Sequence, residues 1–221
     1  MFLLTSLALY RKVSPMDSNW AAENLQTIRV LMERTAVYRR ALAPTMLVSG
    51  GVGLTTGLLG WLKGGFDSIG FILLWLGAAL IALAGSMWII RKQAIGAAEP
   101  FWTAPTRRIA ESALPGFLAG VVVAIAGILK PEILDLGCLV GAWTVLYGIA
   151  LNSAAFFMQR GVRLFSWALI ILGFSLTLAR CGSILPQLDG RGACLWMGGI
   201  FGIIHLSYAF YLRLTERIPS P

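Results

Sequence analysis

Residues 69–90 read IGFILLWLGAALIALAGSMWII, a stretch without one charged side chain. A helix of this length is about 33 Å long at 1.5 Å per residue, and the hydrocarbon core of a bilayer is about 30 Å thick. An irregular segment would leave backbone polar groups unpaired in lipid, and the alternating pattern of barrel strands is absent. The stretch therefore predicts a transmembrane helix.

Five similar apolar segments surround this one, so the sequence predicts an all-α integral membrane protein. Residues 42–212 are expected to form a six-helix transmembrane bundle, followed by a short cytoplasmic tail over residues 213–221. The composition agrees, because 57% of residues are apolar and 13% are charged, whereas soluble domains carry about 25% charged residues. The other predicted spans cover residues 42–62, 112–129, 136–158, 164–180 and 193–212.

The basic residues indicate which way the spans run. Only Lys63, Lys130, Arg180 and Arg191 fall on one side of the predicted spans, and the other fourteen Lys and Arg residues fall on the opposite side. Because basic residues collect in cytoplasmic segments, we expect both termini in the cytoplasm. The net charge of +8 is then an orientation signal and not a nucleic-acid-binding surface. The majority side holds Arg11, Lys12, Arg29, Arg34, Arg39, Arg40, Arg91, Lys92, Arg107, Arg108, Arg160, Arg163, Arg213 and Arg217.

The region before the first span has two parts. Residues 1–15 contain an apolar run too short to span a bilayer, with basic residues after it, which is the reverse of a signal peptide. We interpret them as a spurious or disordered leader before a start at Met16. Residues 16–41 are expected to form an amphipathic helix along the cytoplasmic headgroups, because apolar and basic residues fall on different faces. Docking of a soluble partner is the alternative role for this helix.

Two stretches carry a family resemblance: AENLQTIRVLMERTAVYRRALAP at residues 22–44 and EPFWTAPTRRIAESALPG at residues 99–116. Both resemble segments of an uncharacterised family of small bacterial proteins with six transmembrane spans and an amphipathic N-terminal helix of the ENLxxIRxLMER type. The resemblance covers about the first half of the chain. It implies the bacterial inner membrane and no activity, and it agrees with a start at Met16.

Glycines recur at helical spacing in three of the predicted spans. Small faces allow helices to approach closely in lipid, where no hydrophobic force drives them together. We expect these faces to form the contacts of a tight bundle, and a homodimer interface or a sliding surface remain alternatives. The glycines are Gly50, Gly53, Gly57 and Gly60, then Gly116 and Gly120, then Gly137 and Gly141.

Two polar residues at membrane depth, Asn152 and His205, lie on the packed faces of their spans and at similar depths. We hypothesise a polar intramembrane cluster of Asn152, His205, Ser86, Glu111 and Tyr208. Its simplest role is hydrogen bonding between helices, with a neutral histidine. A proton or ligand site is the alternative.

The three cysteines suggest one cross-link. Cys181 and Cys194 flank the last external segment, CGSILPQLDGRGAC. In the oxidising periplasm a bridge between them is a hypothesis that would stabilise by roughly 3 kcal/mol in the chain-entropy model. Two free thiols are the alternative, and Cys138 would stay unpaired. The cysteine spacing and the single histidine argue against a structural zinc site.

The sequence contains no catalytic motif and predicts no cofactor. Ser153, in LNSAAF, lacks the glycine-rich setting of an intramembrane serine protease. No span carries an acidic or basic residue at its middle, which argues against a proton-coupled pump. We expect a non-enzymatic membrane component that contacts lipids and either itself or another membrane protein. The alternative is a transporter or channel for a small solute, with a cytoplasm-facing cavity around Asn152 and His205.

Overall fold

The structure is a computed structural model that describes residues 41–216 except 97, 99, 134 and 159. Within this part of the chain, six helices are long and apolar enough to cross a membrane, and all other described residues form turns or loops. The predicted all-α bundle of six spans is therefore confirmed. The predictions for residues 1–15, for residues 16–40 and for the last five residues of the tail lie outside the described residues.

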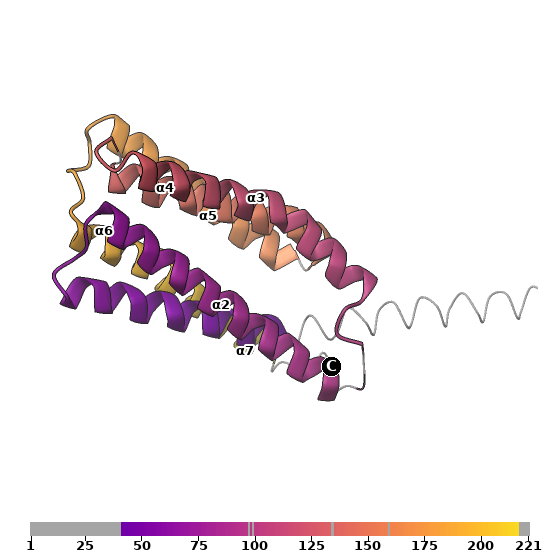
Figure 1. The fold of residues 1–221 in the computed structure, drawn as a ribbon. Coiled ribbons are helices and arrows are strands. Elements are labelled where there is room, and N and C mark those ends of the chain that lie inside the picture. Colours follow the sequence, from indigo (N-terminus) through magenta and orange to yellow (C-terminus); the bar gives the residue numbers. More distant parts are fainter. Residues whose placement is uncertain (1–40, 97, 99, 134, 159, 217–221) are drawn as a thin grey trace, which may run out of the picture. The chain divides into compact units, whose positions relative to one another are not determined.

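The six spans follow one another with short connections (Figure 1). The first is a helix over Ala41–Leu62. The next four are formed by α2 (Ser68–Gly96), α3 (Ala104–Leu129), α4 (Leu136–Ala154) with the 3-10 turn η1 (Ala155–Phe157), and α5 (Arg160–Cys181). The last span consists of three consecutive segments: α6 (Gly190–Met197), the π-helix η2 (Gly198–Ile204) and α7 (His205–Glu216).

The connection between the second and third spans is shorter than the sequence suggested. Thr103 caps α3, and its side chain accepts a hydrogen bond from the Thr106 amide. A threonine cap followed by proline in the first turn is a standard helix start. Arg107 and Arg108, which precede the predicted third span, therefore belong to α3.

The helices α3, α4 and α5 lie side by side, with α4 in contact with both neighbours (Figure 1). The span of α4 is the most buried of the six. Its Trp143 stacks on Phe71 of α2, with ring centroids 6.2 Å apart. The indole Nε1 of Trp143 donates to the Gly120 carbonyl of α3 at 3.0 Å. This residue therefore joins three helices and keeps its own buried N–H satisfied.

Glycines bring the Ala41–Leu62 helix against the last span. A Cβ atom at Gly57 would lie 2.6 Å from Gly198 Cα, and one at Gly53 would lie 2.5 Å from the Phe201 carbonyl oxygen. Gly50 and Gly60 face Leu206 and Cys194 in the same way. The glycine face predicted from the spacing is thus a close contact between the first and last spans.

The remaining predicted glycines contribute unequally. Gly116 lies against Ala150, and Gly141 lies against Thr177 and the Gly173 carbonyl. Gly137 lies against the side chain of Arg180. Gly120 makes no close contact through its Cα, and its carbonyl instead accepts the bond from Trp143. Close packing therefore explains seven of the eight glycines.

The outward faces of the helices carry large apolar side chains. Leu80, Ile81 and Trp88 of α2 are each more than 60% exposed. A water-soluble protein rarely exposes apolar surface on this scale. The exposure fits helices whose outer faces contact lipid.

Candidate functional site

Of the predicted polar cluster, only His205 is fully buried, with 1% of its surface exposed. Its Nε2 atom lies 2.9 Å from the hydroxyl oxygen of Tyr147, which comes from α4. Its Nδ1 atom lies 3.3 Å from the carbonyl oxygen of Ile200. A carbonyl only accepts, so Nδ1 carries the proton, and Tyr147 donates its hydroxyl proton to Nε2. We call Tyr147 and His205 the polar pair.

Aromatic rings surround the polar pair. The Phe165 ring of α5 meets the imidazole edge to face at a centroid distance of 5.0 Å, and the Phe201 ring lies nearly parallel to it at 5.9 Å. Phe117 of α3 contacts the Tyr147 ring at 6.1 Å. Rings from α4, α5 and the last span therefore contact the histidine, the α3 ring contacts Tyr147, and both histidine nitrogens are satisfied within the bundle.

The π-helix η2 determines which neighbouring helices the side chain of His205 faces. Gly198 and Gly202, within η2, face the Ala41–Leu62 helix. His205 follows directly and faces Tyr147 and Phe165 instead. A π-helix is wider than an α-helix and is found mostly as a short insertion inside α-helices, frequently at functional sites. Here it lets one span pack glycine backbone on one neighbour and an imidazole on two others.

The other members of the predicted cluster do not join the polar pair. The Asn152 side-chain oxygen lies 3.3 Å from the hydroxyl of Ser166, which is fully buried. Glu111 forms an exposed ion pair with Arg107 at 3.2 Å. Ser86 is half-buried on α2, with no hydrogen bond to the polar pair. The structure therefore buries the predicted histidine and bonds it to Tyr147, a residue outside the predicted cluster.

Tyr208 is close to the pair without being bonded to it. Its ring stacks on Phe165 at a centroid distance of 4.7 Å. Its hydroxyl is buried and has no hydrogen-bond partner among the described residues. Tyr208 thus extends the aromatic enclosure and adds no bond to it.

One small cavity among the described residues lies elsewhere. It has a volume of about 10 Å³ and is lined by Val140, Leu176, Arg180, Leu185 and Trp196, among others. A cavity needs at least about 10–15 Å³ to hold one water molecule. This space is therefore no larger than a single water requires, and neither Asn152 nor His205 lines it.

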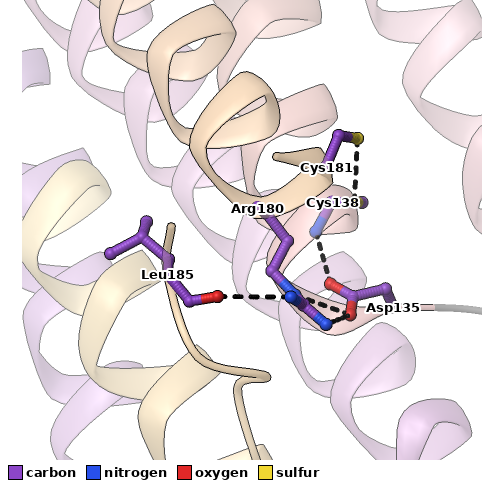
Figure 2. Close-up of polar contacts among 5 residues, drawn as sticks. All are labelled: Asp135, Cys138, Arg180, Cys181 and Leu185. Atoms are coloured by element: carbon purple, nitrogen blue, oxygen red, sulfur yellow. Dashed lines mark hydrogen bonds and ion pairs between the residues drawn. The ribbon is translucent and has the colours of Figure 1, made fainter. Parts of the chain in front are cut away.

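A second group of polar side chains lies where α4 begins and α5 ends (Figure 2). Asp135 caps α4, and its Oδ1 atom accepts from the Cys138 amide at 2.9 Å. Its Oδ2 atom accepts from Nε of Arg180 at 2.8 Å and pairs with Nη2 at 2.8 Å. Arg180 also donates through Nη1 to the Leu185 carbonyl at 3.2 Å. We call Asp135, Cys138, Arg180 and Cys181 the end cluster.

The charge pair of the end cluster is partly buried, with about a fifth of each side chain exposed. Burial by itself raises the pKa of Asp135. The hydrogen bond from Arg180, the Cys138 amide and the Arg180 charge outweigh burial, so the pKa of Asp135 lies below its usual value of 3.8. The carboxylate is therefore ionised at neutral pH and ties α4 to α5.

The arrangement of the cysteines differs from the one that a Cys181–Cys194 bridge would require. The sulfur atoms of Cys138 and Cys181 are 3.9 Å apart, and neither forms a disulfide. Cys194 is fully buried and packs against Gly60 of the first span. The neighbour of Cys181 is thus Cys138, because α4 and α5 are adjacent antiparallel helices and the two thiols lie at the same end.

Comparisons of this chain with protein-family models, with curated proteins and with solved structures found no match. The resemblance to a family of small six-span bacterial proteins therefore stays a prediction. What can be argued about function rests on the two polar sites.

Sequence reasoning missed three of the residues in these sites, Tyr147, Asp135 and Arg180. Tyr147 carries a hydroxyl at membrane depth, and such a group needs a partner, so it was a candidate for His205. Asp135 and Arg180 were visible as opposite charges at the ends of consecutive predicted spans. Consecutive spans usually pack together, which would also have placed Cys138 beside Cys181.

Proposed function

We propose that this chain is a non-enzymatic, multi-pass protein of the bacterial inner membrane, with both termini in the cytoplasm, that acts by binding another membrane component. The observation that carries the proposal is the closed interior: His205 is 1% exposed, bonded on both nitrogens and enclosed by rings. A bundle closed in this way offers its surfaces to partners and no route to solutes.

The glycine contacts support the same proposal. Backbone of the first span lies directly on backbone of the last span at Gly53 and Gly57, so no room for a solute is left between them. The exposed surfaces are the lipid-facing helix sides and the helix ends. A partner would bind there, and the basic N-terminal segment is the part that the sequence favours for cytoplasmic contacts.

The first test is reconstitution of the full chain into liposomes. We expect no flux of protons or small neutral solutes above that of protein-free liposomes. Flux that depends on the protein would contradict the proposal.

The second test is cross-linking and co-purification from native membranes. We expect a defined partner to co-purify with the wild-type chain, and less of it with Arg29→Glu plus Arg34→Glu in the N-terminal segment. Arg213→Glu is the matched control, because it reverses an exposed charge on the same predicted side of the membrane. Equal loss of partner in the control would show a general charge effect.

The orientation is tested with reporter fusions. A phosphatase that is active only outside the cytoplasm is expected to be active after residue 131 and inactive at the C-terminus. The opposite pattern would reverse the proposed topology.

One observation favours a carrier as the second candidate. The polar pair joins α4 to the last span by a single hydrogen bond, and such a contact can open. A carrier of this kind would show flux in the liposome test, and His205→Ala would abolish it. If flux persists in His205→Ala, the polar pair is not the transport site.

A further inference from the structure

The end cluster contains two thiols in near contact (Figure 2). The sulfur atoms of Cys138 on α4 and Cys181 on α5 are 3.9 Å apart. Cys181 is exposed and Cys138 is half-buried. A disulfide bond is about 2.05 Å long, so the sulfurs need to approach by about 1.9 Å. Rotations about the two Cα–Cβ bonds can supply a movement of this size.

The ion pair of the end cluster positions both thiols. Asp135 accepts from the amide of Cys138, which fixes the first turn of α4. Arg180 is bonded to Asp135 and directly precedes Cys181 in the chain. The Asp135 carboxylate therefore holds the backbone at Cys138 directly. Through Arg180 it also holds the backbone next to Cys181.

We propose that Cys138 and Cys181 are a reversible dithiol that is oxidised to an intramolecular disulfide by exchange with an external disulfide. The bond would join the start of α4 to the end of α5 beside the Asp135–Arg180 pair. The site is a covalent modification site, and it does not depend on the proposed function or on the orientation of the chain.

The exchange has two steps. The exposed Cys181 gives up its proton to solvent, and its thiolate attacks one sulfur of the external disulfide. A mixed disulfide forms on Cys181, and one external thiolate leaves and takes up a proton. Cys138 then gives up its proton, and its thiolate attacks the Cys181 sulfur and displaces the second external thiolate, which takes up a proton. Two protein thiols are oxidised, and one external disulfide is reduced to two thiols.

The test uses the full chain, purified in detergent and incubated with oxidised glutathione. Free thiols are then blocked in denaturant, disulfides are reduced, and the released thiols are labelled with a maleimide polymer. We expect two labels on the wild type and two on Cys194→Ser. In Cys138→Ser and Cys181→Ser we expect no label that comes from a Cys138–Cys181 disulfide. Mass spectrometry of the joined peptides identifies the bond.

Three outcomes would overturn the proposal. The wild type could carry no disulfide after incubation with oxidised glutathione. Mass spectrometry could find the Cys181 and Cys194 peptides joined in Cys138→Ser, which would mean that Cys181 bonds to Cys194. The bond could also join two chains, seen as a dimer on a non-reducing gel. The wild-type measurement decides the matter even if a serine variant fails to fold.

The role of the ion pair has its own measurement. In Arg180→Gln we expect the mixed glutathione adduct on Cys181 to accumulate, because the second step slows by at least about tenfold when the thiols are no longer aligned. Arg180→Lys, which keeps the charge, should restore part of the rate. If Arg180→Gln closes the disulfide as fast as the wild type, Arg180 is not a positioning residue.

Discussion

The hydroxyl of Tyr147 lies 2.9 Å from Nε2 of His205, and this bond links α4 to the last span inside a ring of aromatic side chains. The opposite nitrogen of the imidazole is held by the Ile200 carbonyl of the preceding π-helix. The histidine is thus fixed in one tautomer, and Tyr147 is its one link to α4 by hydrogen bond among the described residues.

Replacing Tyr147 by Phe is expected to destabilise the bundle by about 1–2 kcal/mol. The bond itself is worth about 0.6 kcal/mol on average between membrane helices, and a buried imidazole nitrogen is left unpaired in addition. Thermal unfolding in detergent measures the change. In a double-mutant cycle with His205→Phe, the two effects should not add, and additive effects would show that the two side chains are not coupled.

The neighbouring Tyr208→Phe is expected to behave in the opposite way. Its hydroxyl is buried without a partner among the described residues, so removing it relieves an unpaired polar group. We predict an unchanged or higher unfolding temperature in the same assay. A loss as large as that of Tyr147→Phe would mean that Tyr208 has a partner in the folded protein.

The contact between the first and last spans predicts a contrast between two glycines about 1.7 turns apart. A methyl group at Gly57 would meet Gly198 Cα and the Cys194 carbonyl oxygen at 2.6 and 2.8 Å, and these are backbone atoms. Gly57→Ala is therefore expected to lower the free energy of unfolding by about 1–3 kcal/mol.

Gly51→Ala is the matched control in the same helix, because a methyl group there meets nothing within 4 Å. We expect no loss, and a gain of up to about 1 kcal/mol from the better helix propensity of alanine. Equal losses at the two positions would show that the glycines act through backbone flexibility and not through packing.

The number of spans was predictable from sequence because hydropathy is a local property. The glycine face of the first span was predictable for the same reason, since Gly50, Gly53 and Gly57 show their spacing within one helix. The third predicted span begins at residue 112 and α3 begins eight residues earlier, because hydropathy marks only the apolar core and a helix can continue beyond it.

The neighbours of the polar residues were not predictable in the same way. The segment GGIFGII has the composition of an ordinary apolar helix, and its π-helical form arises where glycine backbone packs on one neighbour and His205 on others. The partner of Cys181 likewise depends on which spans are adjacent. To predict the partner of Cys181, one must know that α4 packs against α5. The cysteine nearest in the sequence, Cys194, is not that partner.

The Asp135–Arg180 pair predicts a defined response to acid. Because the pKa of Asp135 is lower in the folded protein than its usual value of 3.8, the folded state holds this proton less tightly than the unfolded state. The stabilisation is complete above about pH 4 and is lost as the pH falls through the lower, folded pKa. The unfolding temperature of the wild type should therefore drop below pH 4.

Asp135→Asn isolates this effect, because asparagine keeps the side-chain oxygen that caps α4 but removes the charge. At pH 7 we expect the variant to unfold at a lower temperature than the wild type. As the pH falls below about 4 and through the lower, folded pKa, the difference between the two should shrink, because the wild-type carboxylate becomes protonated.

Glu132→Gln provides the comparison at neutral pH, because the Lys130–Glu132 pair is mostly exposed at 3.9 Å. Exposed pairs contribute little to stability, so this variant should match the wild type at pH 7. A difference between wild type and Asp135→Asn that stays constant from pH 7 to pH 2 would contradict the charge pair as its cause. It would leave the geometry of the helix cap as the reason why Asp135 matters.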